Sequence, residues 1–224
     1  MTTVITTAAT ETPAATPGIT AIARRLDTSD TQQLAHRLTP VFAAWLDALG
    51  AADPTRMSDE DIRLMAAAAN RIGVRDALIV TALNAEEAGT AEHAAAVATE
   101  PHTPEHAIWA ARTLQNAFDS KTPTISPERY ATAGILLAKA TDLALDDTDT
   151  IDVTGDPATQ QAAAEREANL LATIGYLAWF TGHDEDATRF AIAAHKSQPN
   201  ISLARLILDG VTNNIHPDSI PETR

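Results

Sequence analysis

One histidine and three acidic residues follow one another at His183-Asp184-Glu185-Asp186, and these residue types could do chemistry together. An imidazole beside carboxylates could act as an acid–base pair, and the carboxylates could bind a divalent cation. The same acids would also stabilise the start of a helix, because negative charge there complements the helix dipole. The spacing of a calcium-binding loop is absent. We therefore favour the helix start and keep an enzyme with a His/carboxylate site as an alternative.

A second pair, His102 and His106, has a spacing that can bring two imidazoles to one metal ion on a continuous helix. Pro104 lies between them and predicts that the helix begins after His102, so we expect solvated histidines there. The sequence contains no cysteine, which excludes a disulfide framework, a thiolate zinc site and a cysteine nucleophile. It also has no phosphate loop, dinucleotide fingerprint, nucleophile elbow or zinc-protease motif. We predict no catalytic residues, no metal and no cofactor.

Charged and aromatic residues beside apolar stripes form a third group of candidates. For Arg75 and Asp76, we expect a partly buried arginine that pairs with a carboxylate and holds two helices in register, rather than a catalytic role. Arg205 is expected to pair in the same way. Trp179 is expected in the core or lining a groove, with an exposed binding anchor as the alternative. The candidate partner-binding or structural residues are Arg75, Asp76, Trp179, Gly182, Asp184 and Arg205.

The element that must position several of these residues is a helix–turn–helix unit over residues 171–200. Leu171, Ile174 and Leu177 share one helix face, and Gly182 follows where a left-handed cap residue is needed. A stripe of small residues in the second helix would let two helix axes approach closely, and a proline then ends the unit: Ala187, Ala191, Ala194 and Pro199. This pattern resembles a tetratricopeptide repeat without its usual large aromatics. An ordinary Ala-rich αα-hairpin is the alternative.

Two sequence landmarks occur in order along the chain. The first is Gly73-Val74-Arg75-Asp76-Ala77-Leu78-Ile79, and the second is Ala178-Trp179-x-x-Gly182-x-x-x-x-Ala187 followed by Pro199 and Ser202-Leu203-Ala204-Arg205-Leu206. Their order and spacing resemble the C-terminal helical part of an actinobacterial family, domain of unknown function number 4192. The resemblance covers roughly residues 55–215 and implies a helical fold and an actinobacterial host, or a phage or plasmid within one. The family brings no established activity. Members usually begin with an α/β-like segment that this chain lacks, and Asp184 stands near the family's second turn glycine.

The composition favours helices built from small and aliphatic residues. Hydrophobic residues make up 45% of the 224 residues and aromatic residues 4%. No alternating β-branched run indicates a strand. We predict an all-α fold of antiparallel helical hairpins, with about seven to nine helices. A single domain is expected over residues 18–212, with a possible acidic loop at 142–157, a disordered Thr/Ala/Pro tail at 1–17 and a polar tail at 213–224.

The formal net charge of −14 bears on the partners. Such a field repels nucleic acid and anionic membranes, so we predict no direct binding to either. The sequence lacks both an apolar run of ~20 residues and a secretory signal, which favours the cytoplasm. We predict a non-catalytic helical module for protein–protein interaction, with an unidentified protein partner and an open oligomeric state. An acidic decoy that occupies a DNA-binding protein is a further alternative.

Overall fold

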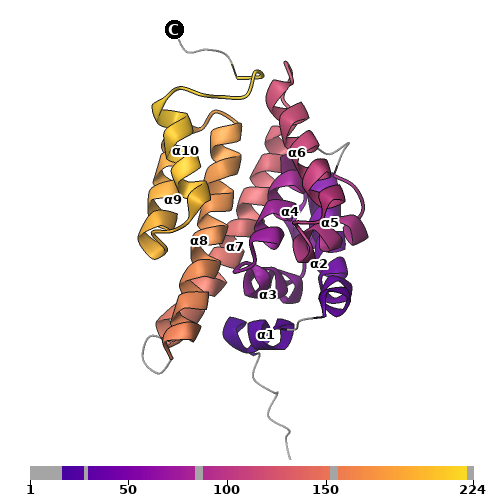
Figure 1. Cartoon of the computed structure of the whole chain (residues 1–224), viewed down its shortest axis with the longest axis vertical. Helices are drawn as coiled ribbons and strands as arrows, with labels where there is room; N and C mark the ends of the chain where they lie inside the picture. The colour runs from indigo at the N-terminus through magenta and orange to yellow at the C-terminus, as the bar shows by residue number, and fades with distance from the viewer. Residues whose placement is uncertain (1–16, 28–29, 84–87, 152–155, 221–224) are drawn as a thin grey trace, which may run out of the picture.

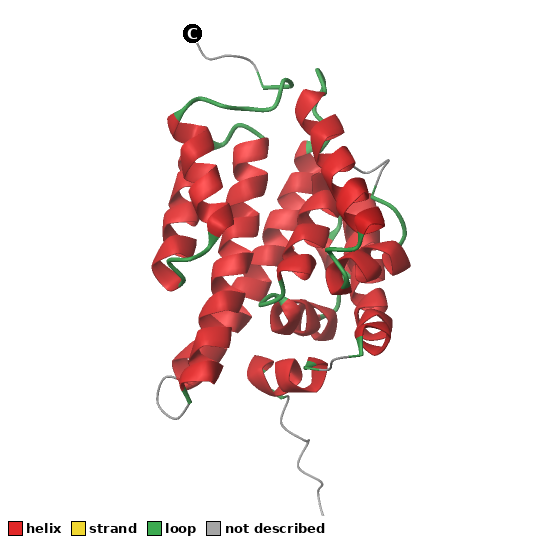
Figure 2. Ribbon diagram, in the orientation of Figure 1, coloured by secondary structure: helices red, strands yellow, loops and turns green. Residues whose placement is uncertain are grey.

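The computed structural model describes residues 17–27, 30–83, 88–151 and 156–220, and in these ranges it is helical without any strand. This confirms the predicted all-α class, although the described ranges hold ten α-helices rather than seven to nine (Figure 2). The helices, with one 3₁₀ turn η1, are α1 (Ile19–Leu26), α2 (Thr31–Ala51), η1 (Pro54–Arg56), α3 (Asp59–Ala68), α4 (Ile72–Leu83), α5 (Ala91–Thr99), α6 (Pro104–Asp119), α7 (Pro127–Ile151), α8 (Pro157–Phe180), α9 (Asp184–Ser197) and α10 (Ser202–Thr212).

The long helices α7 and α8 pack against each other near the middle of the molecule (Figure 1). On one side α9 and α10 cover α8, and on the other lie α2, α4, α5 and α6, while α1 and α3 cross the lower end in this view. The main core contains buried side chains of α1 to α8, including Trp45, whose indole N–H donates to Thr81 Oγ1 at 3.0 Å. A second cluster around Trp179 joins α8, α9 and α10.

Several helices begin where a polar side chain can accept a backbone N–H from the first turn. Asp30, Ser58, Thr90 and Asp156 all do this, at the starts of α2, α3, α5 and α8. The first N–H groups of a helix have no partner within the helix, and a side-chain oxygen of this kind satisfies one of them. The boundaries of these helices are therefore encoded locally.

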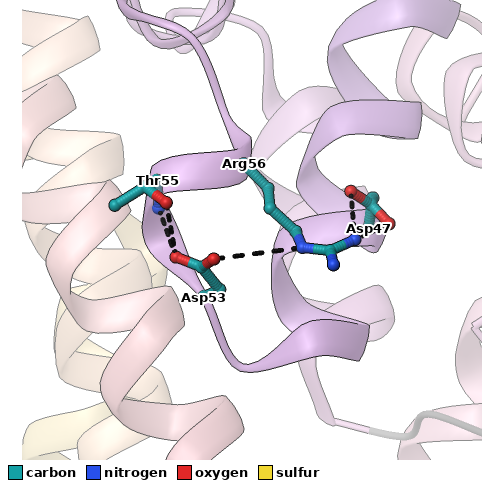
Figure 3. A network of polar contacts seen from close by, with 4 residues as sticks. All are labelled: Asp47, Asp53, Thr55 and Arg56. Atoms are coloured by element: carbon teal, nitrogen blue, oxygen red, sulfur yellow. Dashed lines mark hydrogen bonds and ion pairs between the residues drawn. The ribbon is translucent and has the colours of Figure 1, made fainter.

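A polar network fixes the turn between α2 and α3 (Figure 3). Asp53 caps η1 by accepting the backbone N–H of Thr55 at 2.9 Å and its hydroxyl at 2.7 Å. Arg56 reaches back to Asp47 at 3.0 Å and lies 4.0 Å from Asp53. The hydrogen bonds from Thr55 lower the pKa of Asp53, because they stabilise its ionised form. The network is exposed, and we assign it a local structural role.

The prediction of an acidic loop at 142–157 is wrong over most of that range, because α7 continues to Ile151 and α8 starts at Pro157. Ala140 and Ala144 are buried on the face of α7 that packs into the core, whereas Asp142 and Asp146 lie on its exposed face. Acidic residues placed only on the solvent face do not oppose a helix whose other face is buried. Residues 152–155 lie outside the described ranges.

The residues after α10 were predicted to form a polar tail, and in the structure they contact the rest of the molecule. Residues 213–220, which we name the C-terminal segment, run from α10 across the upper end of the molecule (Figure 1). The backbone N–H of Asp218 donates to the carbonyl of Phe118 at 2.9 Å, and the Asp218 carboxylate pairs with Lys121. The predicted tail at 1–17 falls, except for its last residue, outside the described residues. Across the described helices, none has both the length and the apolar character needed to cross a membrane.

Candidate functional site

The turn between α8 and α9 brings His183 to the upper end of α8. Gly182 adopts φ +78°, a left-handed conformation that costs glycine little, and its N–H donates to the carbonyl of Trp179 at 3.1 Å. The two helices then pack closely, since a Cβ on Gly175 would lie 3.3 Å from the carbonyl oxygen of Ala187. The small residues predicted to form this contact, Ala187, Ala191 and Ala194, are fully buried.

Trp179 lies in the second core and is not an exposed anchor. Its residue surface is 5% exposed, and its indole N–H donates to the carbonyl of Ile215 in the C-terminal segment at 2.8 Å. The ring also packs directly on Gly210 of α10, where an added Cβ would lie 2.9 Å from ring atoms. Trp179 therefore links α8, α10 and the C-terminal segment.

A mainly apolar pocket of about 310 Å³ opens between the α6–α7 connection, the α8–α9 turn and the C-terminal segment. Residues 123–127 form one wall, Phe180 and Thr181 a second, and Ser219 and Ile220 a third. Ile220 also packs on Gly182, which has no side chain to displace it. Tyr130 of α7 also lines the cavity, and we name it the Tyr130 pocket.

Three polar side chains meet at one side of the Tyr130 pocket. The rings of Tyr130 and His183 stack, with centroids 5.2 Å apart and planes 11° from parallel. Thr181 Oγ1 lies 2.9 Å from His183 Nδ1 and donates its own proton to the carbonyl of Leu177 at 2.8 Å. The Thr181 hydroxyl therefore links the ring of His183 to the last turn of α8.

The phenol of Tyr130 keeps its proton over a wide pH range. Burial raises its pKa, and the negative charge of Asp186 raises it further, while a hydrogen bond with Thr181 and the charge of Arg189 act in the opposite direction. A phenol with a raised pKa is a poor base near neutral pH but remains a hydrogen-bond donor. The Tyr130 hydroxyl is therefore suited to binding.

The position of Tyr130 follows from its neighbour Arg129, which ties the start of α7 to the end of α4. Arg129 is buried, and its guanidinium donates to the carbonyls of Ala82 at 2.9 Å and Thr81 at 2.6 Å. These carbonyls lie at the C-terminal end of α4, where the helix dipole favours a cation. Ser126 accepts the N–H of Arg129 at 3.2 Å and so marks the helix start, as its sequence context indicates.

Thr124 is a further pocket residue that sequence analysis missed. Its Oγ1 is buried and has no hydrogen-bond partner within the described part of the chain. A buried hydroxyl without a partner costs free energy, and a bound group with a donor or acceptor would recover it. The only sequence signal at this position is a polar residue in a Pro-rich connection, which does not distinguish it from an ordinary loop residue.

The structure separates the members of the 183–186 run. His183 faces Tyr130 and Thr181, whereas Asp184 lies 3.4 Å from His216 of the C-terminal segment and Asp186 pairs with Arg189 at 2.8 Å. Within the described residues, no three His or acidic side chains gather in a way that could hold a metal. The run therefore starts α9 and tethers the C-terminal segment, and its carboxylates do not pair with His183.

Arg75 pairs with the carboxylate of Asp76, its neighbour on the same helix α4. The guanidinium of Arg75 donates to Asp76 Oδ1 at 2.7 and 2.9 Å and approaches Asn169 Oδ1 of α8 at 3.5 Å. Asn169 in turn donates to the carbonyl of Ala69 at 2.9 Å, at the end of α3. These contacts join α8 to the region between α3 and α4.

The expectation for Arg205 is wrong. Its side chain is exposed, and the described residues hold no ion pair with it. Ala204 and Ile207 lie on the buried face of α10, which packs against α8 and α9. Arg205 lies on the exposed face of the same helix. Its place between apolar neighbours in sequence therefore did not indicate burial.

The second histidine pair does not lie on one continuous helix. Helix α6 begins at Pro104, so His102 precedes it, as the proline predicts. His106 Nδ1 lies 2.8 Å from the carbonyl oxygen of Glu100, and its ring contacts that of His93 at a centroid distance of 5.8 Å. Both contacts are local packing between α5 and α6.

With this geometry established, comparison with known proteins adds no assignment. No protein-family model, no curated protein and no solved structure matches the chain. The resemblance to family number 4192 stays a prediction from the residues that carry it.

Proposed function

We propose that the protein is a non-catalytic helical module that binds a partner protein, and that the partner inserts one apolar side chain into the Tyr130 pocket. The observation that carries this proposal is the pocket itself: a mainly apolar cavity of about 310 Å³ with a few hydroxyls at its edge. Pockets for drug-sized ligands and cofactors measure about 300–1,000 Å³, so this one lies at the small end. A single large side chain suits it better than a nucleotide-sized cofactor. Interface anchors of this kind carry much of the binding energy in protein complexes.

The polar groups of the pocket favour binding over proton transfer. Tyr130 keeps its proton and can donate to a carbonyl of the partner's backbone. Thr124 offers a second hydroxyl without a partner among the described residues. His183 makes its hydrogen bond to Thr181 rather than to a carboxylate, so an acid–base dyad is not formed. The His/carboxylate enzyme alternative therefore has little support from the geometry.

Charge around the pocket supports one class of partner. Glu128 and Glu185 are exposed on the first turns of α7 and α9, next to pocket residues of the same elements. The chain as a whole carries a formal charge of −14. A partner segment with Lys or Arg beside its apolar anchor would be attracted to this rim, and opposite charge speeds association. We therefore propose an occupant with one large apolar residue flanked by basic residues.

The test is selection of binding peptides from a displayed random library against the full chain. We expect enriched peptides to contain a large apolar residue beside Lys or Arg, with affinity near or tighter than ~1 μM. Ile220→Asp, which places a charge in the pocket wall, should weaken these peptides at least tenfold, roughly 1.4 kcal/mol. Ile108→Asp makes the same change at an isoleucine that is 64% exposed on α6, and it should have no effect. Peptides that bind both variants equally would contradict the proposal.

The acidic-decoy alternative gives a different result in the same assay. Binding carried by exposed charge should weaken steeply between about 50 and 200 mM salt and should compete with DNA. Binding carried by an apolar anchor should change little over that range, because apolar burial is not screened by salt. The salt series therefore separates the two functions with one set of reagents.

We make three further proposals from the residues. They are membership of the actinobacterial family number 4192, a tetratricopeptide-like hairpin and a cytoplasmic location. The close approach at Gly73 supports the first landmark, since an added Cβ would collide with the backbone of Ala98. The left-handed Gly182 supports the second, since the turn requires that conformation. A member that carries the same glycines in the same packing would strengthen the relationship.

A further inference from the structure

A polar cavity of about 250 Å³ lies where the turn between α9 and α10 meets α8 and the start of α4. Figure 1 shows α8 between α4 and the α9–α10 pair, and α8 contacts all three of these helices. The residues that line the cavity all belong to the described ranges, and none of them lines the Tyr130 pocket. The proposed partner-binding site therefore does not account for it.

Side-chain carboxamides dominate the lining of this cavity, and we name it the amide pocket. Five of its ten lining residues are asparagine or glutamine: Asn70 after α3, Gln161 and Asn169 of α8, and Gln198 and Asn200 of the α9–α10 turn. A carboxamide offers two N–H donors and an oxygen acceptor in one plane. The pocket therefore presents donors and acceptors side by side on three walls.

Gln198 is the residue that most directly indicates a ligand. It is 8% exposed and lines the cavity, and no described residue makes a hydrogen bond with its carboxamide. Its backbone is already engaged, because its N–H donates to the carbonyl of Ala194 at 2.9 Å and its own carbonyl accepts from Ile201 at 3.2 Å. The half-buried carboxamide of Asn70 is likewise without a partner among the described residues. Buried polar groups without a partner cost free energy, and a ligand with donors and acceptors would recover it.

The charged side chains of the amide pocket do not favour an ion. Arg75 is the one cation among the described residues that line it, and its Nε and Nη2 already donate to Asp76. Its Nη1 makes only the 3.5 Å contact with Asn169. Glu165 is the one lining carboxylate in the described ranges, and it accepts from Gln161 Nε2 at 2.8 Å. Arg75 would repel a metal ion, Glu165 would repel an anion, and an amino acid would compete with Asp76 for the guanidinium, so a neutral ligand is favoured.

We propose that the amide pocket binds a neutral monosaccharide. Each sugar hydroxyl both donates and accepts, and planar carboxamide, guanidinium and carboxylate groups can each contact two neighbouring hydroxyls. The cavity is smaller than the ~300–1,000 Å³ of pockets for drug-sized ligands, so a single sugar ring suits it better than an oligosaccharide. Ile72 also lines the cavity and is 55% exposed, which offers an apolar contact to the C–H groups of the ring.

The test is a ¹H–¹⁵N NMR titration of the full chain with four sugars, namely glucose, galactose, mannose and ribose. Glycine and sodium phosphate, at the same concentrations, serve as a zwitterionic and an anionic probe. We expect at least one sugar to shift the side-chain amide signals of Gln198 and Asn70 saturably, with a Kd of ~1 mM or tighter. Glycine and phosphate should not shift these signals, because the charged groups of the pocket are already paired or repel them.

Gln198→Leu keeps a side chain of similar size but removes the carboxamide, and it should weaken sugar binding at least tenfold. Because that carboxamide has no partner among the described residues, urea unfolding should show no loss of stability. The matched control is Gln32→Leu, the same change at an exposed glutamine of α2, and it should bind the sugar normally.

Asn70→Ala is a second variant that should weaken binding, and it keeps the test informative if Gln198→Leu fails to fold. Three results would overturn the proposal. They are the absence of saturable shifts with all four sugars, equal affinity in Gln198→Leu and Gln32→Leu, and tighter binding of glycine or phosphate than of any sugar at the same amide signals.

Discussion

The packing of α4 against the end of α5 depends on the absence of a side chain at Gly73. A Cβ at this position would lie well inside van der Waals contact with the carbonyl oxygen of Ala98, and 2.9 Å from its carbon. Both are backbone atoms, so no rotamer change can relieve the contact and the two helices must move apart. Forced shifts of this kind cost about 1–3 kcal/mol, and alanine recovers up to about 1 kcal/mol because glycine loses more entropy on folding. We expect Gly73→Ala to lower the free energy of unfolding by about 1–2 kcal/mol.

Gly134→Ala in α7 is the matched control. No atom lies within 4 Å of a Cβ built at Gly134, so only the entropic gain applies there. This substitution should raise the free energy of unfolding by about 0.5–1 kcal/mol. The two variants make the same chemical change and should shift stability in opposite directions, by about 1.5–3 kcal/mol relative to each other.

Urea unfolding followed by far-ultraviolet circular dichroism measures this difference. With a slope of about 2–3 kcal/mol per molar urea, the two midpoints should be about 1 M apart, with that of Gly73→Ala the lower. A midpoint for Gly73→Ala at or above that of the unmodified chain would refute the argument from close approach. If both variants were destabilised equally, the entropic estimate for an open helical position would be wrong instead.

Three further predictions use the same unfolding assay or a titration. Thr81→Val removes the hydroxyl that accepts the indole N–H of buried Trp45, so the free energy of unfolding should fall by about 1–3 kcal/mol. Ser58→Ala removes the cap of α3 and should cost about 1 kcal/mol. Burial raises the pKa of Tyr176 from 10.0 to about 12. Because the unfolded chain loses this proton first, stability should fall as pH rises from 10 to 12, by at most roughly 3 kcal/mol, and ultraviolet absorbance should show this late ionisation in the folded protein.

The α8–α9 hairpin could be predicted in detail because its determinants are local. The apolar period, the left-handed Gly182 and the alanine stripe all act within one or two helical turns of the residues they position. The caps at Ser58 and Ser126 belong to the same class, since each accepts an N–H three residues away. Determinants that act over so few residues can be recognised in a single sequence.

The C-terminal part of α7, where we predicted an acidic loop, shows where prediction from the local sequence fails. Six acids without a base between residues 142 and 157 indicate exposure, and Asp142 and Asp146 are indeed exposed. Exposure, however, does not distinguish a loop from the solvent face of a helix. The deciding contribution is burial of Ala140 and Ala144 against neighbouring helices, which a charge pattern does not report.

The Tyr130 pocket could not be predicted because its walls meet only in the folded molecule. Tyr130 and Thr124 belong to the start of α7 and the connection before it, His183 to the α8–α9 turn, and Ile220 to the C-terminal segment. In the sequence, Tyr130 is one apolar position on a helix and Ile220 lies in a polar stretch. The stacking of Tyr130 on His183 is a tertiary contact, and neither residue's neighbours encode it.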